Sequence, residues 1–110
     1  MVEVGCHITI SRNGQAFLSP QKTELLRQIK TGGSLNAAAK AMGISYQHAW
    51  NLIDEMNRMA PHPLVEKQRG GANGGGATVS TYGEQILNEY KLIEAEIANL
   101  IKRINVEINL

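Results

Sequence analysis

Short runs of alternating apolar and polar residues flank an Asn13-Gly14 pair near the start of the chain. The runs, 7–11 and 15–18, contain Ile, Thr and Phe, which fit the half-buried surface of a strand. A type I′ turn needs two central residues that accept positive φ, and Asn followed by Gly meets this need. The pattern predicts a short two-stranded hairpin.

Two helices are predicted after the hairpin. Ser19 can cap the first, and Pro20 suits its first position, where a missing N–H loses no hydrogen bond. Residues 31–33 end this helix. Ser34 can cap the second, an alanine-rich segment that ends at Gly43, where a left-handed residue permits a tight turn. The small alanine side chains let another helix approach closely.

A third helix follows the Gly43 turn, with Ser45 as its cap, and extends to about Met59. Apolar and polar positions separate onto opposite faces. The apolar face holds Tyr46, Ala49 or Trp50, Ile53 and Met56, and the polar stripe holds Gln47, Asn51, Asp54 and Arg58. With Ala39 where the second and third helices touch and Leu52 facing inward, this pattern predicts a helix-turn-helix unit.

Prolines at 61 and 63 stop the third helix, and two β-prone segments, 64–69 and 77–79, flank the glycine-rich stretch 70–76. Two strands joined by such a tip predict a β-wing. A plain flexible loop is the alternative. The stretch is not a phosphate-binding P-loop, because no Gly-Lys-Ser/Thr follows it and it does not open a helix.

The last helix is predicted to begin near Ser80 or Thr81, since Thr81 and Glu84 have the spacing of a capping box. Its Ile and Leu residues recur every three or four positions. The stripe can fold onto its own chain, but a helix of this length extends beyond so small a domain. We therefore expect a dimer through Ile86, Tyr90, Ile93, Ile97, Leu100 and Ile104.

The order of these elements predicts a mainly α (α+β) winged helix-turn-helix. We expect a DNA-binding domain over 1–80 and a C-terminal dimerisation helix over 81–110. A total of 110 residues allows one domain with a real core. With no apolar run of membrane-spanning length and no signal peptide, we expect a cytoplasmic protein that does not engage a membrane.

Composition and spacing argue against several other classes of protein. The single cysteine, Cys6, cannot form an internal disulfide, and the three histidines (7, 48 and 62) lie too far apart to suggest a metal site. No Ser/His/Asp or Cys/His arrangement is recognisable, and Asp54 and Glu55 point to different faces of their helix. We expect neither a metal nor catalysis.

The charge is divided unevenly along the chain. Residues 1–80 carry eight Lys or Arg against five Asp or Glu, a net charge of +3, and residues 81–110 carry three against five, a net charge of −2. A basic excess this small is weak evidence for nucleic-acid binding by itself. The motifs therefore carry the functional argument.

The second helix of a helix-turn-helix unit enters the DNA major groove, and its first two turns contact base edges. Gln47, His48 and Asn51 are therefore the predicted base readers, since Gln and Asn pair bidentately with adenine. Other predicted DNA contacts, mostly to the backbone, are Ser34, Lys40, Ser45, Tyr46, Lys67, Arg69 and Asn73.

Three of these assignments have alternatives or limits. Lys67 and Arg69 are as readily explained as solvated strand residues. Stacking on bases by Tyr46 and Trp50 is less favoured than packing in the core. The carboxylates of Asp54 and Glu55 repel DNA phosphates. We therefore expect the part of the third helix that enters the groove to end before Asp54.

Several segments together resemble the N-terminal domain of ModE-type molybdate-responsive transcriptional regulators. The resemblance covers about residues 20 to 95. It rests on the segments 33–40, 43–50, 54–57, 63–66 and 70–77, and above all on the Ser-Tyr-x-x-Ala-Trp start of the third helix combined with the Gly-Gly-x-x-Gly-Gly-Gly wing. A looser similarity to LysR-type regulators involves Arg69, Val79, Ser80 and Gly83.

The resemblance implies a homodimeric winged-helix protein that binds double-stranded DNA, with repression of genes for molybdate or related metal handling as the expected role. Full regulators of this type carry C-terminal Mop domains that bind molybdate or tungstate, and this sequence ends at Leu110 without such a pattern. We therefore expect no cofactor. Family members often have a basic residue at the position of Gln47, so the operator is expected to differ. An interaction module that pairs with a separate sensor protein is the alternative.

Overall fold

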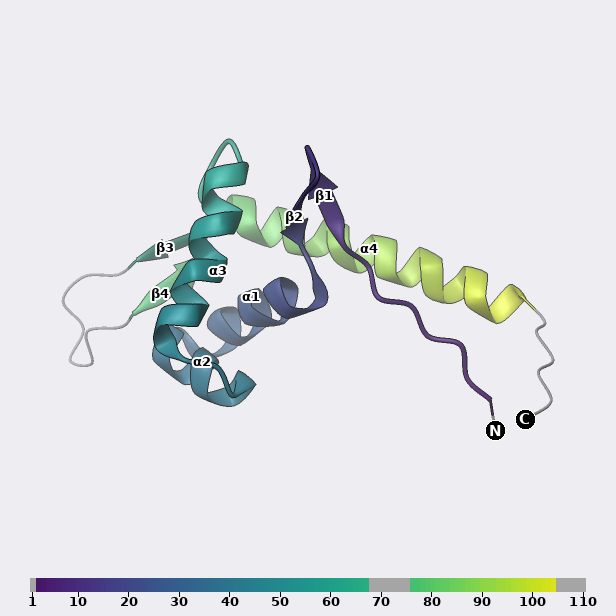
Figure 1. Ribbon diagram of the computed structural model, residues 1–110, viewed down its shortest axis with the longest axis horizontal. Coiled ribbons are helices and arrows are strands. Elements are labelled where there is room, and N and C mark those ends of the chain that lie inside the picture. Colours follow the sequence, from purple (N-terminus) through teal and green to yellow (C-terminus); the bar gives the residue numbers. More distant parts are fainter. Residues whose placement is uncertain (1, 68–75, 105–110) are drawn as a thin grey trace.

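The computed structural model describes residues 2–67 and 76–104. A three-helix body lies beside a β-wing, and a long last helix runs away from both (Figure 1). The winged helix-turn-helix prediction is confirmed. The elements, in chain order, are β1 (Ile10–Arg12), β2 (Gln15–Leu18), α1 (Pro20–Gly32), α2 (Leu35–Met42), α3 (Tyr46–Met59), β3 (Val65–Lys67), β4 (Ala77–Val79) and α4 (Thr81–Arg103).

The N-terminal hairpin has the predicted turn but a shorter first strand. Asn13 and Gly14 have φ of 52° and 80°, as a type I′ turn requires. β1 begins at Ile10, and residues 7–9, which we had expected in the strand, lie outside the ladder. The register shifts after Ile10, which pairs with Leu18. Only the Ile10–Leu18 pair of the ladder lies beyond this irregularity, and Ser11–Ala16 and Arg12–Gln15 lie on the turn side of it.

The predicted caps of the first two helices are confirmed. The Ser19 hydroxyl accepts a hydrogen bond from the Lys22 N–H, and the Ser34 hydroxyl accepts one from the Ala37 N–H. Gly33 ends α1 with a φ of 65°. Because the serine oxygens satisfy N–H groups that have no partner inside the helix, each helix begins at the residue after its serine.

The apolar face of α3 is rotated slightly from the predicted one. Ala49, Leu52, Ile53 and Met56 are buried in the core, but Tyr46 is 39% exposed. The core role favoured for Tyr46 is therefore wrong. Packing onto α1 and α2 turns the side of α3 that carries residues 49 and 52 inward, and this leaves Tyr46 at the edge.

The wing is attached firmly to the end of α3. β3 pairs antiparallel with β4, and Gly76 forms a bridge to Ser34 at the start of α2. The Asn57 carboxamide accepts from the Leu64 N–H at 2.8 Å and donates to the Val65 carbonyl at 3.1 Å. One side chain of α3 thus hydrogen-bonds the backbone on both sides of the Leu64–Val65 peptide and fixes where the first wing strand leaves the core.

The structure decides between the two predicted starts of α4. Ser80, not Thr81, accepts from the Gly83 N–H at 3.0 Å, so the expected capping box is absent. The Ser80 hydroxyl also donates to the carbonyls of Pro63 and Leu64. These contacts come from the segment before the wing, and they favour Ser80 over its neighbour.

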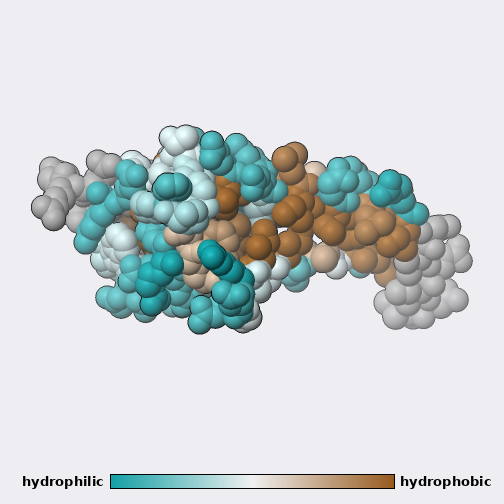
Figure 2. Space-filling model, turned by 90° about the horizontal axis from the view of Figure 1, so that it is seen from above, coloured by the Kyte–Doolittle hydropathy of each residue, from teal (hydrophilic) through white to brown (hydrophobic). Residues whose placement is uncertain are grey.

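The two ends of α4 have different surroundings. Leu87 and Tyr90 are buried in the core, and the Tyr90 hydroxyl donates to the Ile8 carbonyl at 2.7 Å. Tyr90 therefore packs within its own chain and is not part of an exposed dimerisation stripe, because the N-terminal segment covers it. Beyond this point the helix extends out of the body, and hydrophobic residues gather along that end of the molecule (Figure 2).

Candidate nucleic-acid interface

α2 and α3 meet through small side chains at the Gly43 turn. Gly43 has a φ of 69°, and the Ile44 N–H donates to the Ala39 carbonyl at 3.0 Å. Ala39 is 2% exposed and Ala49 is fully buried, so the helices approach closely where the sequence has no bulk. This packing holds α3 against α2 at the turn that joins them (Figure 1).

The outer face of α3 carries most of the predicted contact residues. Gln47, His48 and Asn51 are all exposed, and the Gln47 Nε2 donates to the Asn51 Oδ1 at 3.0 Å. These two carboxamides lie one helical turn apart and orient one another. Asp54 and Arg58 continue the same exposed stripe, and the Arg58 Nε donates to the Asp54 carbonyl. The predicted polar stripe is therefore a real surface.

A polar residue of α1 that no sequence pattern singled out lies beside this face. The Gln21 side-chain nitrogen on α1 is 3.5 Å from the His48 Nε2. Gln21 is 27 positions away in the sequence, and an exposed Gln near a helix start carries no signal of such a contact. α1 therefore adds a polar side chain next to a predicted base reader.

The remaining predicted contacts are spread around the helix-turn-helix. The Ser45 hydroxyl accepts from the His48 N–H at 3.0 Å and so acts as the helix cap, as the Ser34 hydroxyl does for α2. Lys40 is exposed on α2. Two further predicted contacts, Arg69 and Asn73, lie outside the described residues.

An aromatic edge borders α3 on the side of the wing. The Tyr46 and Trp50 rings lie 6.4 Å apart in an edge-to-face arrangement, with an interplanar angle of 81°. The Lys67 ammonium of β3 lies 4.9 Å from the centre of the Trp50 ring. No pattern in the sequence predicts this contact between the wing and α3.

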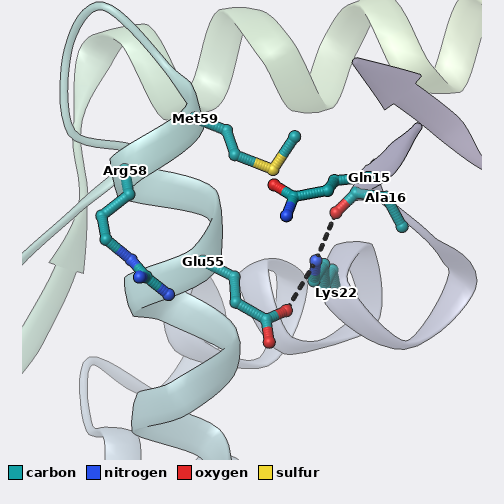
Figure 3. Close-up of a pocket in the computed structure, with 6 residues that line it drawn as sticks. All are labelled: Gln15, Ala16, Lys22, Glu55, Arg58 and Met59. Atoms are coloured by element: carbon teal, nitrogen blue, oxygen red, sulfur yellow. Dashed lines mark hydrogen bonds and ion pairs between the residues drawn. The ribbon is translucent and has the colours of Figure 1, made fainter. Parts of the chain in front are cut away.

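The opposite edge of α3 faces the hairpin across a hollow of about 450 Å³. Its lining residues are Gln15, Ala16, Lys22, Glu55, Arg58 and Met59. Lys22, with only 5% of its side chain exposed, donates to the Ala16 carbonyl and forms an ion pair with Glu55 at 3.0 Å (Figure 3). The Lys22 ammonium thus offsets the negative charge of Glu55 at this edge of α3.

The described part of the chain holds no cluster of three or more His, Cys, Asp or Glu that could bind a metal ion. Within the same ranges, no helix combines the length and the apolar character needed to cross a membrane. What the described residues do offer is an exposed polar helix face, bordered by the wing on one edge and by the hairpin on the other.

Several curated proteins have sequences similar to this chain. The chain is 41% identical over 87 residues to the transcriptional regulator ModE of Haemophilus influenzae, covering 79% of this chain and 34% of that protein. It is 40% identical over 86 residues to the DNA-binding transcriptional dual regulator ModE of Escherichia coli, covering 78% and 33%. A third relative is the molybdenum-pterin-binding protein MopB of Rhodobacter capsulatus, 35% identical over 103 residues.

The chain therefore spans about a third of the length of these relatives, and the match lies in their N-terminal part. No protein-family model matches the chain. Among solved structures, a LysR family transcriptional regulator aligns with a TM-score of 0.55 at 17% identity, over 71% of this chain and 25% of that one. At this identity the likeness concerns the fold alone.

Proposed function

Over the part that it shares with them, this chain belongs to the ModE family of transcriptional regulators, and we propose that it is a sequence-specific DNA-binding regulator. The observation that carries this proposal is the exposed face of α3, which carries Gln47, His48 and Asn51, while Ala49 is buried in the core. An α-helix fits the major groove of B-DNA, and carboxamides can read base edges there.

The Gln47–Asn51 pair suits an adenine. The hydrogen bond between them uses one Gln47 donor and the Asn51 oxygen, so the pair still offers the Gln47 oxygen as acceptor and the Asn51 amide as donor. Adenine presents a donor at N6 and an acceptor at N7 in the major groove. In this proposal each half-site contains an adenine opposite the second turn of α3.

Backbone contacts surround this reading face. Lys40 on α2 and Lys67 on the wing are exposed cations, and the Lys67 ammonium lies against α3 at Trp50. Contacts of this kind fix the position of a protein on the duplex but carry no sequence information. We assign Arg69 and Asn73 of the wing to the same role, on the strength of their places in the sequence.

The regulator is proposed to act as a homodimer through α4. Ile93, Leu100 and Ile104 are between 40% and 50% exposed, which is unusual for three such residues on one stripe of a helix. Packing of this stripe against the same stripe of a second chain removes these side chains from solvent. A two-fold axis then places the two α3 helices about 34–36 Å apart, on successive major grooves of one DNA face.

The genes under control are proposed to concern molybdenum, since relatives are described as molybdenum transport and molybdenum-pterin-binding proteins. We propose that it acts in the bacterial cytoplasm and represses these genes, since a protein bound at an operator can block transcription. The alternative, a dimerising module that pairs with a separate sensor protein, lacks an observation in its favour beyond the exposed end of α4.

Selection from a random pool tests the proposal. Duplexes bound at physiological salt are recovered and sequenced, with the double variant Gln47→Ala/Asn51→Ala as the matched control. We expect a palindrome with half-sites about one helical turn apart, and loss of its conserved adenines with the control. A pool without enrichment would overturn sequence-specific binding and turn attention to a protein partner.

A further inference from the structure

The contact between Lys67 and Trp50 joins the two parts of the molecule that are expected to face DNA. The ammonium lies 4.9 Å from the ring centre, inside the roughly 6 Å range of a cation–π interaction. Trp50 is half-buried on α3, and Lys67 is exposed on β3. The two residues are 17 positions apart in the sequence, so the contact depends on how the wing sits against α3.

The backbone of β3 directs Lys67 towards α3. Residues two apart on a strand point to the same side, and Val65, two positions before Lys67, is 3% exposed against the core. The Asn57 carboxamide of α3 holds Val65 through its carbonyl. β3 is thus fixed to α3 at Val65, and the Lys67 side chain extends along the edge of the core and contacts Trp50.

A cation over a ring keeps its hydrogen-bonding capacity. The attraction comes from the ring quadrupole, so the ammonium needs to turn only part of its three N–H groups towards the ring, and the others remain free as donors. Among the residues that the structure describes, no Asp or Glu forms an ion pair with Lys67, whereas Lys22 and Lys30 each have one. Lys67 is thus held in place and remains able to donate to a phosphate.

We propose that Trp50 is a positioning residue that holds the Lys67 ammonium beside α3, so that the recognition helix and the wing meet one stretch of DNA backbone as a unit. The inference rests on the proposed function, since it assigns a partner, a backbone phosphate, to Lys67. Trp50 itself touches no base in this arrangement. The face of its ring restricts the Lys67 side chain, which would otherwise sample many rotamers.

The contact is first tested in the free protein, without DNA. Ring currents shift protons above an indole upfield, so the Lys67 side-chain methylene signals are compared by NMR between the wild type and Trp50→Leu. Trp50→Phe is the matched control, because it keeps an aromatic face. We expect upfield-shifted Lys67 signals in the wild type and in Trp50→Phe, and their return to ordinary positions in Trp50→Leu. Ordinary positions in the wild type would overturn the proposal.

DNA binding is then measured against salt concentration for the wild type, Trp50→Leu, Lys67→Met and the double variant. Loss of one phosphate contact lowers the slope of log K against log salt by about 1. We expect this reduction in both single variants, a roughly two- to fivefold weaker affinity for Trp50→Leu, and no further loss in the double variant. Lys67→Arg is expected to keep the wild-type slope of log K against log salt, since a guanidinium also stacks on indole.

Other outcomes are distinguishable. Weaker binding by Trp50→Leu with an unchanged slope means a merely structural role for Trp50, and additive losses mean that the two residues act independently; either result overturns the inference and leaves the proposed function intact. Absence of salt-dependent duplex binding by the wild type overturns both. Should Trp50→Leu fail to fold, Trp50→Phe and Lys67→Met carry the comparison: the wild-type slope is expected for Trp50→Phe and a slope lower by about 1 for Lys67→Met, and equal slopes for the two variants would overturn the inference.

Discussion

At the scale of single residues, Gly83 determines how closely α4 approaches the wing. A Cβ at this position would collide with the Leu64 carbonyl oxygen and lie 2.8 Å from the Val79 Cγ1. The Leu64 carbonyl also accepts from the Ser80 N–H at 2.8 Å. Only a residue without a side chain lets the first turn of α4 pack against this backbone.

Gly83→Ala is therefore expected to destabilise the protein by about 1–3 kcal/mol, because α4 must shift away from the Leu64 carbonyl. Urea unfolding followed by circular dichroism measures the change. Gly32→Ala is the matched control, since a Cβ there meets nothing within 4 Å. A glycine-to-alanine change in the last turn of α1 is expected to leave the stability equal or slightly higher. Equal effects of both substitutions would contradict this account of Gly83.

The reading face allows a second prediction for single residues. Replacement of Gln47 or Asn51 by alanine removes one member of the hydrogen-bonded pair and is expected to reduce discrimination at one operator position by about 1–3 kcal/mol. Competition binding with single-base operator variants measures it. Lys40→Ala is the control, because loss of a phosphate contact weakens binding to all sequences alike. Unchanged base preference would mean that another element reads the DNA.

At the scale of elements, the hairpin and α1 fix the tilt of α3 through Lys22. Its ammonium joins the Ala16 carbonyl of β2 to the Glu55 carboxylate of α3. The Arg12 guanidinium adds a hydrogen bond to the Met59 carbonyl at 2.9 Å, at the end of α3. The short β-ladder therefore braces α3 from the side opposite the wing.

The two partners of the Lys22–Glu55 ion pair are expected to differ in how much their replacement lowers the free energy of unfolding. Glu55→Ala leaves a buried ammonium with the Ala16 carbonyl alone and is expected to cost about 1–3 kcal/mol, less than for a fully buried pair because the carboxylate is half-exposed. Lys22→Met removes the buried charge, keeps the apolar stem, and is expected to cost less. Chemical denaturation compares the two variants, and a larger loss for Lys22→Met would refute this reading.

At the scale of the whole molecule, the outer half of α4 has no partner in the core. The molecule measures 56 × 29 × 22 Å, and its long dimension follows this helix (Figure 1). The N-terminal segment runs beside it, and a hollow of about 520 Å³ between them is lined by Ile97 and Ile101, among others. Ile93 and Leu100 remain open to solvent.

The exposed stripe gives a prediction for the assembly. Ile93→Glu combined with Leu100→Glu is expected to convert a dimer into a monomer and to weaken operator binding at the same time, because two half-sites are no longer bound together. Sedimentation equilibrium and DNA titration measure the two effects. Asn99→Glu is the control, since this residue is exposed on another face of α4. A dimer that survives the double substitution would place the interface elsewhere.

The local part of the fold was predictable because its causes are local. Ser19, Ser34 and Ser45 each accept from an N–H three residues ahead, and the left-handed Gly43 follows from the turn that it makes. The exposed stripe of α3 followed from helical periodicity in the same way. These features depend on neighbours in the sequence, so the sequence alone determined the helices, the wing and the candidate reading face.

Features that join distant segments were decided by the tertiary structure. Tyr90 turned inward because the Ile8 carbonyl, 82 positions away, lies over it, and Ser80 became the cap because the segment before the wing accepts its hydroxyl. The contacts of Gln21 with His48 and of Lys67 with Trp50 have the same origin. Periodicity places a residue on a face of its own helix, but only the packing of the elements determines what that face meets.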